Sequence, residues 1–357
     1  MTEAAPGVVA APGLRVVVVG AGAVGSFLGG TLAAAGCEVT LLGRRVTSGG
    51  RGQTPLVIVG PEGSRTVAVR RAADPAAVDV VPDVLLFAVK AFDLEGALET
   101  AERWPGTPVV TAQNGVGAEG VVAELRASPL IAASLTTAVE PVHGGVARRR
   151  RGGIGLAAVR GDVDGLVASL AVAFEAGDLP SLVCPDATAM KWSKLLANLV
   201  GNASGALLDM DPGAIYADGD GFALERAQLR EAVAVMGALG LQRISVPGAQ
   251  VDLLLTGLRL PAWIARPVLA RAIGRARGGK SPSLRLHVRG AATGPTEVRW
   301  LNGAVAAAGA RLGIRVPVNA CLTALVDEAA SDPTGAARWT GRPDLLRHAA
   351  TTWPETR

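Results

Sequence analysis

A glycine-rich motif near the start of the chain constrains the fold more than any other feature. The motif Gly20-Ala21-Gly22-Ala23-Val24-Gly25 has the spacing G-x-G-x-x-G, and it lies between a run of valines and an uncharged segment that ends near Gly36. A strand, a tight turn and a helix in this order are typical of a dinucleotide-binding α/β domain. The alternative is a glycine-rich turn in another α/β fold.

Each glycine of this motif has a physical role in such a domain. Gly20 permits the tight turn, Gly22 lets the backbone approach a pyrophosphate, and Gly25 lets the helix pack closely on the strand. The pyrophosphate then lies on the N-terminus of the helix, where backbone N–H groups point outward. We therefore assign the motif to a cofactor site that comprises Gly20, Gly22, Ala23, Val24 and Gly25.

Short apolar runs separated by helical segments follow the motif. We predict strands at Leu14–Gly20, Glu38–Leu42, Asp83–Val89 and Pro108–Ala112, with a helix after the first of them. Such runs favour a parallel sheet that is covered on both faces, as in a Rossmann doubly wound sheet.

The pattern becomes mostly helical after about Pro185. Helices are predicted at Ala187–Asn202, Gly221–Leu239 and Val298–Leu312, with few strand signals between them. The expected fold class is therefore α/β, with a Rossmann domain followed by a mostly α-helical domain. The predicted divisions are a tail at 1–13, a nucleotide-binding domain at 14–185, a helical substrate domain at 186–330 and an extension at 331–357.

Composition excludes several classes of function. The net charge of +4, from 35 basic and 31 acidic residues, is too small to indicate nucleic-acid binding but suits small anionic ligands. The three cysteines (Cys37, Cys184 and Cys321) are widely spaced, which favours a reducing cytoplasm over a disulfide framework. With only three histidines we expect no metal site. The uncharged stretch 16–37 is glycine-dense, so we predict no integral membrane segment.

The residues after the second strand indicate which dinucleotide is bound. NAD enzymes usually place a carboxylate at the end of this strand to hold the ribose hydroxyls, whereas this chain has Gly43-Arg44-Arg45. A guanidinium suits the 2′-phosphate of NADP, so we predict NADPH with Arg44 as its ligand. The alternative is that both arginines are ordinary loop charges.

Polar residues occur at three further places where ligands bind in such folds. Lys90 ends one predicted strand, and Asn114 follows the next, at the carboxyl edge of the sheet. In the helical domain, Lys194, Asn198 and Asn202 fall at i, i+4 and i+8, which predicts one shared helix face. A lysine with two amides suits an anionic ligand, although a solvated stripe is the alternative.

Taken together, the motifs resemble the ketopantoate reductase (2-dehydropantoate 2-reductase) family over roughly residues 14–328. The matching segments are GAGAVG (20–25), LLGR (41–44), AVKAFD (88–93), QNGVG (113–117), KLLANLVGN (194–202), PTEVRWLNG (295–303) and GIRVPVN (313–319). The resemblance implies a helical domain like the C-terminal domain of 6-phosphogluconate dehydrogenase. It also implies an NADPH-dependent reduction of a 2-keto acid in pantothenate biosynthesis, at a cleft between the domains, and it is compatible with a homodimer.

The resemblance also implies roles for individual residues. Lys194 matches the general acid that protonates the oxyanion, and Glu297 matches the acid that contacts the substrate hydroxyl. Asn198 and Asn202 match residues that hold the substrate's polar ends, while Lys90 and Asn114 match residues near nicotinamide and substrate. Ser283 matches a carboxylate-binding serine.

One segment departs from the family pattern. Residues Val251–Lys280 are expanded and mix apolar residues with six basic ones. We interpret them as an extra amphipathic helix pair with a solvated basic face. The alternatives are a reshaped lid over the substrate pocket, or a contact with a partner or a membrane surface.

Two alternatives to a ketopantoate reductase remain open. A D-2-hydroxyacid dehydrogenase or a pathway-specific ketoreductase would use the same motifs on another 2-keto acid. A non-catalytic NADP sensor or scaffold would retain the glycines and Arg44, but it would not need Lys194 and Glu297, and both are present.

Overall fold

The computed structural model describes residues 13–44, 52–149, 152–249, 251–277, 284–292, 294–332 and 334–354. Contacts divide the chain into two compact units: Met1–Met190 with Val246–Ala249, and Lys191–Ser245 with Gln250–Arg357. The predicted site residue Ser283 lies outside the described residues, as do Arg45 and Lys280.

The described strands of the first unit form one sheet in the order β11-β10-β7-β6-β5-β1-β2-β4-β3-β9-β8. Their bounds are β1 (Arg15–Val19), β2 (Glu38–Leu42), β3 (Gln53–Gly60), β4 (Gly63–Ala72), β5 (Val84–Phe87), β6 (Val109–Thr111), β7 (Leu130–Leu135), β8 (Val139–Val142), β9 (Gly145–Arg148), β10 (Ile154–Arg160) and β11 (Ser181–Val183).

The sheet is parallel at its centre and mixed toward its edges. Strands β2, β1, β5, β6 and β7 run parallel, and they include every strand that the sequence predicted. The predicted parallel sheet is confirmed at this centre, and antiparallel pairs that the sequence analysis did not predict extend it: β3 with β4, β8 with β9, and β10 with β7. The short connection between Gly60 and Gly63 accounts for one of these pairs, because a tight turn joins only antiparallel strands.

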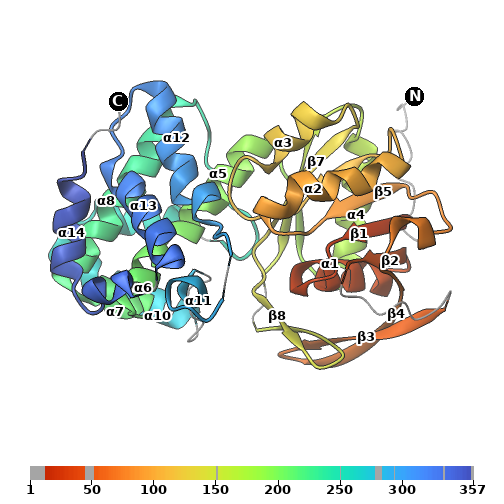
Figure 1. Cartoon of the computed structure of the whole chain (residues 1–357), viewed down its shortest axis with the longest axis horizontal. Coiled ribbons are helices and arrows are strands. Elements are labelled where there is room, and N and C mark those ends of the chain that lie inside the picture. Colours follow the sequence, from red (N-terminus) through yellow and green to blue (C-terminus); the bar gives the residue numbers. More distant parts are fainter. Residues whose placement is uncertain are drawn as a thin grey trace, which may run out of the picture. The chain divides into compact units, whose positions relative to one another are not determined.

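Helices cover both faces of the parallel centre, as expected (Figure 1). Along β1, Val16 and Val18 pack with α1 (Ala23–Ala34) and α4 (Asp164–Ala176), whereas Val17 and Val19 pack with residues of α2 (Leu94–Leu98) and α3 (Ala118–Leu125). Because successive side chains of a strand point to opposite faces, the continuous run of valines serves both layers. The same unit contains the short 3₁₀ turns η1 (Pro75–Ala77), η2 (Ala91–Asp93) and η3 (Glu99–Arg103).

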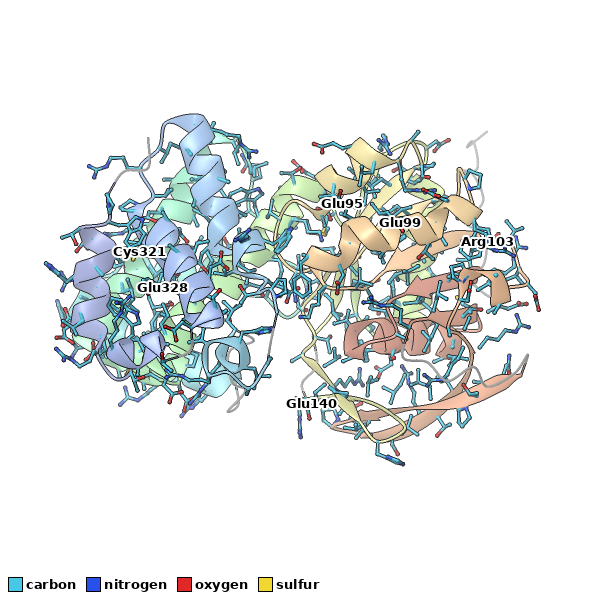
Figure 2. All side chains as sticks on the ribbon, in the orientation of Figure 1. Glu95, Glu99, Arg103, Glu140, Cys321 and Glu328 are labelled. Atoms are coloured by element: carbon cyan, nitrogen blue, oxygen red, sulfur yellow. The ribbon has the colours of Figure 1, made fainter. Side chains whose placement is uncertain are left out.

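The second unit is helical. Its helices are α5 (Ala187–Leu199, which begins in the first unit), α6 (Ala203–Leu208), α7 (Pro212–Ala217), α8 (Gly219–Ala238), α9 (Val251–Arg259), α10 (Ala262–Arg277), α11 (Arg285–Val288), α12 (Asn302–Leu312), α13 (Pro317–Ser331) and α14 (Pro343–Thr351), with 3₁₀ turns η4 (Val298–Trp300) and η5 (Gly335–Trp339). The core surrounds α13, where Cys321, Leu322 and Val326 are fully buried; Cys321 is labelled in Figure 2.

Two stretches of this unit bear on the predicted divisions. Residues from 331 onward were expected to form an extension, yet α14 packs on α8 and α13 and its Leu346 and Ala350 are fully buried in the core. Residues 251–277 form the expected helix pair, α9 and α10, and α10 packs on α7. Within the described ranges, no helix combines the length and apolar character needed to cross a membrane.

Candidate functional site

Two glycines of the motif, Gly20 and Gly25, have no room for a side chain, whereas Gly22 has room for one. Gly20 has φ +107°, and a Cβ there would lie 2.7 Å from the backbone nitrogen of Val89. A Cβ on Gly25 would lie 1.9 Å from the carbonyl oxygen of Gly20, whereas one on Gly22 would meet no atom of the described residues within 4 Å. Gly22 therefore has no structural reason to be glycine, and its open surface fits the close approach of a ligand.

The first turn of α1 completes this surface. Gly22 is the N-cap residue, Ala23 and Val24 open the helix, and none of the side chains that the structure describes caps its N-terminus. The N–H groups of a helix N-terminus attract negatively charged groups, and the helix dipole adds to this attraction. A pyrophosphate is an anion and needs backbone N–H groups that no bulky side chain covers. The loop has both features.

The end of β2 lies beside this loop. The nitrogen of Gly20 donates to the carbonyl oxygen of Leu42 at 2.9 Å, which ties the glycine turn to the last residue of β2. Arg44 follows two residues later and is exposed. A guanidinium is a suitable partner for a phosphate, and the contact of Arg44 with the 2′-phosphate of NADP stays a prediction.

Two further loops meet at the same edge of the sheet. Lys90 follows β5, Asn114 follows the neighbouring parallel strand β6, and both side chains are exposed. Gln113 joins these loops, because its buried Nε2 donates to the carbonyl oxygens of Phe87 (3.0 Å) and Val89 (3.2 Å). Gln113 was not among the predicted site residues. Its two hydrogen bonds tie the residue before Asn114 to the end of β5 and the loop after it.

In the second unit, Lys194 and Asn198 lie together on α5. The Nζ of Lys194 donates to Oδ1 of Asn198 at 2.7 Å, as expected for side chains four residues apart on a helix. The Nδ2 of Asn198 is buried and has no hydrogen-bond partner among the described residues. A buried donor without a partner is costly, so this group is suited to a ligand's acceptor oxygen.

Asn202 does not continue this helix face, so that part of the spacing prediction is wrong. Helix α5 ends at Leu199, Gly201 adopts φ +54°, and Asn202 becomes the N-cap residue of α6. A left-handed residue breaks the helical repeat, because the chain after it leaves the helix axis. Asn202 is nevertheless buried, at 6% exposure, next to the end of α5.

A buried carboxylate on α8 holds this break in place. Glu225 is fully buried and accepts hydrogen bonds from the backbone nitrogen of Gly201 (2.8 Å), from Oγ of Ser204 and from Nε2 of Gln228 (2.8 Å). Sequence reasoning missed Glu225. Its burial beside Leu224 and Gln228 is visible only in the structure.

The remaining predicted residue, Glu297, lies directly before η4 and is 7% exposed. It belongs to the same unit as Lys194. The side chain of Thr296, also buried, accepts a hydrogen bond from the nitrogen of Val298 at 3.3 Å, which fixes the loop that carries Glu297.

The described residues give little support to catalysis by a cysteine nucleophile or by a metal ion. All three cysteines are buried, and burial raises the pKa of Cys37 and Cys184 to about 11 and that of Cys321 to about 12. Thiols with such pKa values are poor nucleophiles near neutral pH. Among the described side chains, no group of three or more histidines, cysteines or carboxylates is arranged to hold a metal ion.

Comparisons with known proteins match both parts of the chain to one family. The family model described as "Ketopantoate reductase PanE/ApbA" matches residues 16–158, and the model "Ketopantoate reductase PanE/ApbA C terminal" matches residues 186–330. A 2-dehydropantoate 2-reductase of Halobacterium salinarum is 33% identical over 328 residues, which cover 89% of this chain and 100% of that protein.

Solved structures give the same result. A PanE/ApbA family ketopantoate reductase from Ralstonia eutropha has a TM-score of 0.72 at 27% identity, covering 90% of this chain and all of that one. A 2-dehydropantoate 2-reductase from Geobacter metallireducens has a TM-score of 0.74 at 26% identity, with 88% and 100% covered. A D-mandelate dehydrogenase, solved with NADH and anilino(oxo)acetate, shares the fold at 17% identity, with a TM-score of 0.72 over 90% and 99% of the two chains. The chain belongs to the ketopantoate reductase PanE/ApbA family and is an oxidoreductase of that family.

Proposed function

We propose that this 2-keto acid reductase converts 2-dehydropantoate to pantoate with NADPH, the reduction that serves pantothenate biosynthesis. The observation that carries the proposal is the pair on α5, in which Lys194 contacts Asn198 and the Nδ2 of Asn198 has no described partner. A cationic proton donor beside an unused amide donor suits a keto group next to a carboxylate.

The cofactor half of the proposal rests on the first unit. Gly22 leaves an open backbone surface at the N-terminus of α1, which fits a pyrophosphate, and Arg44 is exposed after β2, which fits a 2′-phosphate. When bound, NADPH supplies a hydride to the keto carbon. Lys90 and Asn114 would contact the nicotinamide and the substrate from the edge of the sheet.

A residue of the protein then supplies the proton. As negative charge develops on the keto oxygen, the ammonium of Lys194 donates a proton to it, and the product is a neutral hydroxyl. Asn198 and Asn202 would bind the substrate's hydroxyl and carboxylate ends, and Glu297 would accept a hydrogen bond from the substrate hydroxyl. Ser283 keeps its proposed role as a carboxylate ligand.

A second candidate function is the reduction of a bulkier 2-keto acid. The likeness to D-mandelate dehydrogenase and the helix pair α9 and α10 favour it, because this pair occupies the segment that departs from the family pattern. A non-catalytic NADP sensor is disfavoured, since a sensor has no need of the contact between Lys194 and Asn198.

The test is turnover by the purified protein, followed as loss of NADPH absorbance. The substrates are 2-dehydropantoate, phenylglyoxylate and short unbranched 2-keto acids, each with NADPH and with NADH. Fastest turnover of 2-dehydropantoate with NADPH supports the proposal. Preference for phenylglyoxylate would replace it by the second candidate. Tight NADPH binding without turnover of any substrate would favour the sensor.

A further inference from the structure

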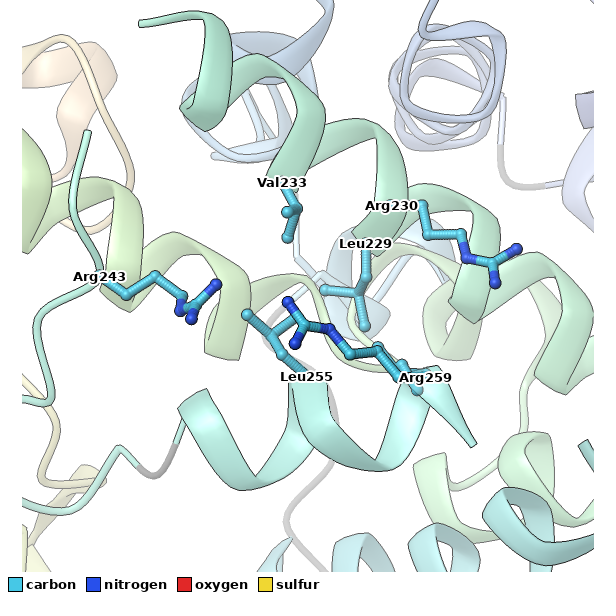
Figure 3. Close-up of a pocket in the computed structure, with 7 residues that line it drawn as sticks. Leu229, Arg230, Val233, Arg243, Leu255 and Arg259 are labelled. Carbon is cyan, nitrogen blue, oxygen red and sulfur yellow. The ribbon is translucent and has the colours of Figure 1, made fainter. Parts of the chain in front are cut away.

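A small pocket in the second unit is lined by arginines around an apolar floor (Figure 3). It lies against α8 and α9, and its volume is about 130 Å³. None of its lining residues belongs to the candidate site. They are Leu229, Arg230, Val233, Arg243, Leu255, Leu258 and Arg259.

Two of the arginines face one another. In Figure 3 the guanidinium groups of Arg243 and Arg259 point toward each other across Leu255, whereas that of Arg230 points away. The Nε of Arg243 donates to Oδ1 of Asp252 at 3.0 Å, and Arg259 forms no ion pair with any carboxylate of the described residues. The pocket thus holds more cationic than anionic charge, and a bound anion would remove the repulsion between the two guanidinium groups.

The sequence around this pocket is depleted of acids to an unusual degree. From Leu253 to Thr296 there is no Asp or Glu, while there are eight Lys and Arg residues. The rest of the chain has 27 basic and 31 acidic residues, so this one segment turns the protein from net negative to net positive. Arg285 and Arg289 pair with Asp209, but Arg259, at the pocket, has no such partner in the described chain.

The neighbouring hollow on α8 has the same character. It contains Arg226 and Arg230, which are four residues apart, and Glu231. The Nε of Arg226 is buried and lacks a partner in the described chain. The carboxylate of Glu231 accepts hydrogen bonds from the backbone nitrogens of Val318 and Asn319, both at 2.9 Å, so it is engaged away from these arginines.

We propose that the pocket between α8 and α9 binds a small organic monoanion with an apolar body, such as a branched or aromatic carboxylate. Arg243 and Arg259 would hold the anionic group, and Leu229, Val233 and Leu255 would cover the hydrocarbon. The volume suits such a ligand, since an engineered apolar cavity of about 150 Å³ holds benzene. This site shares no residue with the proposed reductase site and does not depend on that function.

The experiment is calorimetric titration of the full-length protein with 4-methylpentanoate. Arg259→Gln removes one guanidinium, and Arg271→Gln is the matched control, because Arg271 is exposed on α10 and does not line the pocket. Lys194→Ala separates the pocket from the reductase site. We expect Arg259→Gln to weaken binding about tenfold, as for the loss of one charge-assisted contact, while the other two variants stay within about twofold of the wild type.

Two further ligands test the chemistry of the pocket. The neutral amide 4-methylpentanamide should not bind, and inorganic phosphate should bind at least about tenfold more weakly than the carboxylate, because it cannot use the apolar floor. Equal binding of phosphate would refute a role for the floor. Binding that is lost in Lys194→Ala but kept in Arg259→Gln would refute the site itself, as would the absence of saturable binding.

Discussion

The candidate sites of the two units are made from different parts of the chain, backbone in the first unit and side chains in the second. In the first unit the candidate cofactor surface is backbone, at a glycine turn where Gly22 leaves space and Gly20 and Gly25 cannot carry a side chain. In the second unit the candidate surface consists of two side chains, Lys194 and Asn198. The end of their helix is held by the buried carboxylate of Glu225, which accepts a hydrogen bond from the nitrogen of Gly201. A backbone site is specified by local spacing, whereas a side-chain site depends on packing between helices distant in sequence.

This difference predicts different responses to substitution. Changes in the glycine turn should affect cofactor binding or folding according to which glycine is replaced. Changes on α5 should affect the chemical step, and changes on α8 should affect the stability of the scaffold beneath it.

Replacing Lys194 with Ala should lower turnover roughly 1,000-fold, as expected for the loss of a general acid. NADPH affinity should change less than about twofold, because the glycine turn and Arg44 belong to the other unit. Steady-state turnover and a separate cofactor titration measure the two effects. Lys194→Arg is the control, since it keeps the positive charge but does not release a proton readily. Turnover within about tenfold of wild type in Lys194→Ala would refute the assignment.

Replacing Glu225 with Ala should destabilise the second unit by roughly 3 kcal/mol, because three buried donors lose their acceptor. Denaturant unfolding measures the loss. Glu225→Gln keeps one acceptor oxygen and should lose less. Glu328→Ala, which breaks an exposed ion pair with Arg338, should cost at most about 1 kcal/mol. Similar losses for Glu225→Ala and Glu328→Ala would show that the buried carboxylate does not support the break.

Gly22→Ala and Gly25→Ala should separate binding from folding. A Cβ at Gly22 would meet no described atom, so the variant should unfold at the wild-type denaturant midpoint while its NADPH affinity falls about thirtyfold. A Cβ at Gly25 would lie 1.9 Å from the oxygen of Gly20, so that variant should lose stability first. If Gly22→Ala bound NADPH as tightly as wild type, the pyrophosphate would not approach this backbone.

Sequence analysis predicted the parts of the structure that neighbouring residues determine and missed those that distant segments determine. The strand, turn and helix around Gly20 to Gly25 were predicted correctly, because residues adjacent in sequence determine them. The strands β3, β4, β8 and β9 were missed. They form two local hairpins, but the place of these hairpins in the sheet depends on pairing between distant segments, such as β3 with β9. The spacing from Lys194 predicted the contact with Asn198 but not the helix end before Asn202. That end depends on the hydrogen bond from Gly201 to Glu225, which lies 24 residues away in the sequence.

The burial of the C-terminal stretch has a similar explanation. Its sequence is polar with Pro, Gly and Trp, which suggested a peripheral extension. Only a few of its residues are apolar, yet Leu346 and Ala350 are four residues apart and share one face of α14. One turn-spaced apolar pair is a weak signal in a sequence, and the helices α8 and α13 on which it packs come from other parts of the chain.

Replacing Arg44 with Ala should have the smallest effect and should show how far side chains contribute to the backbone site. Arg44 is exposed, so we expect the loss of its contact to the 2′-phosphate to weaken NADPH binding about tenfold. NADH lacks that phosphate, and its affinity should change less than about twofold. Titration of both cofactors against wild type and variant measures the difference, and Arg103→Ala, an exposed arginine on η3 beside Trp104, is the control. An equal loss for NADPH and NADH would mean that Arg44 contacts a group common to both cofactors, and the specificity for NADP would then have to come from residues other than Arg44.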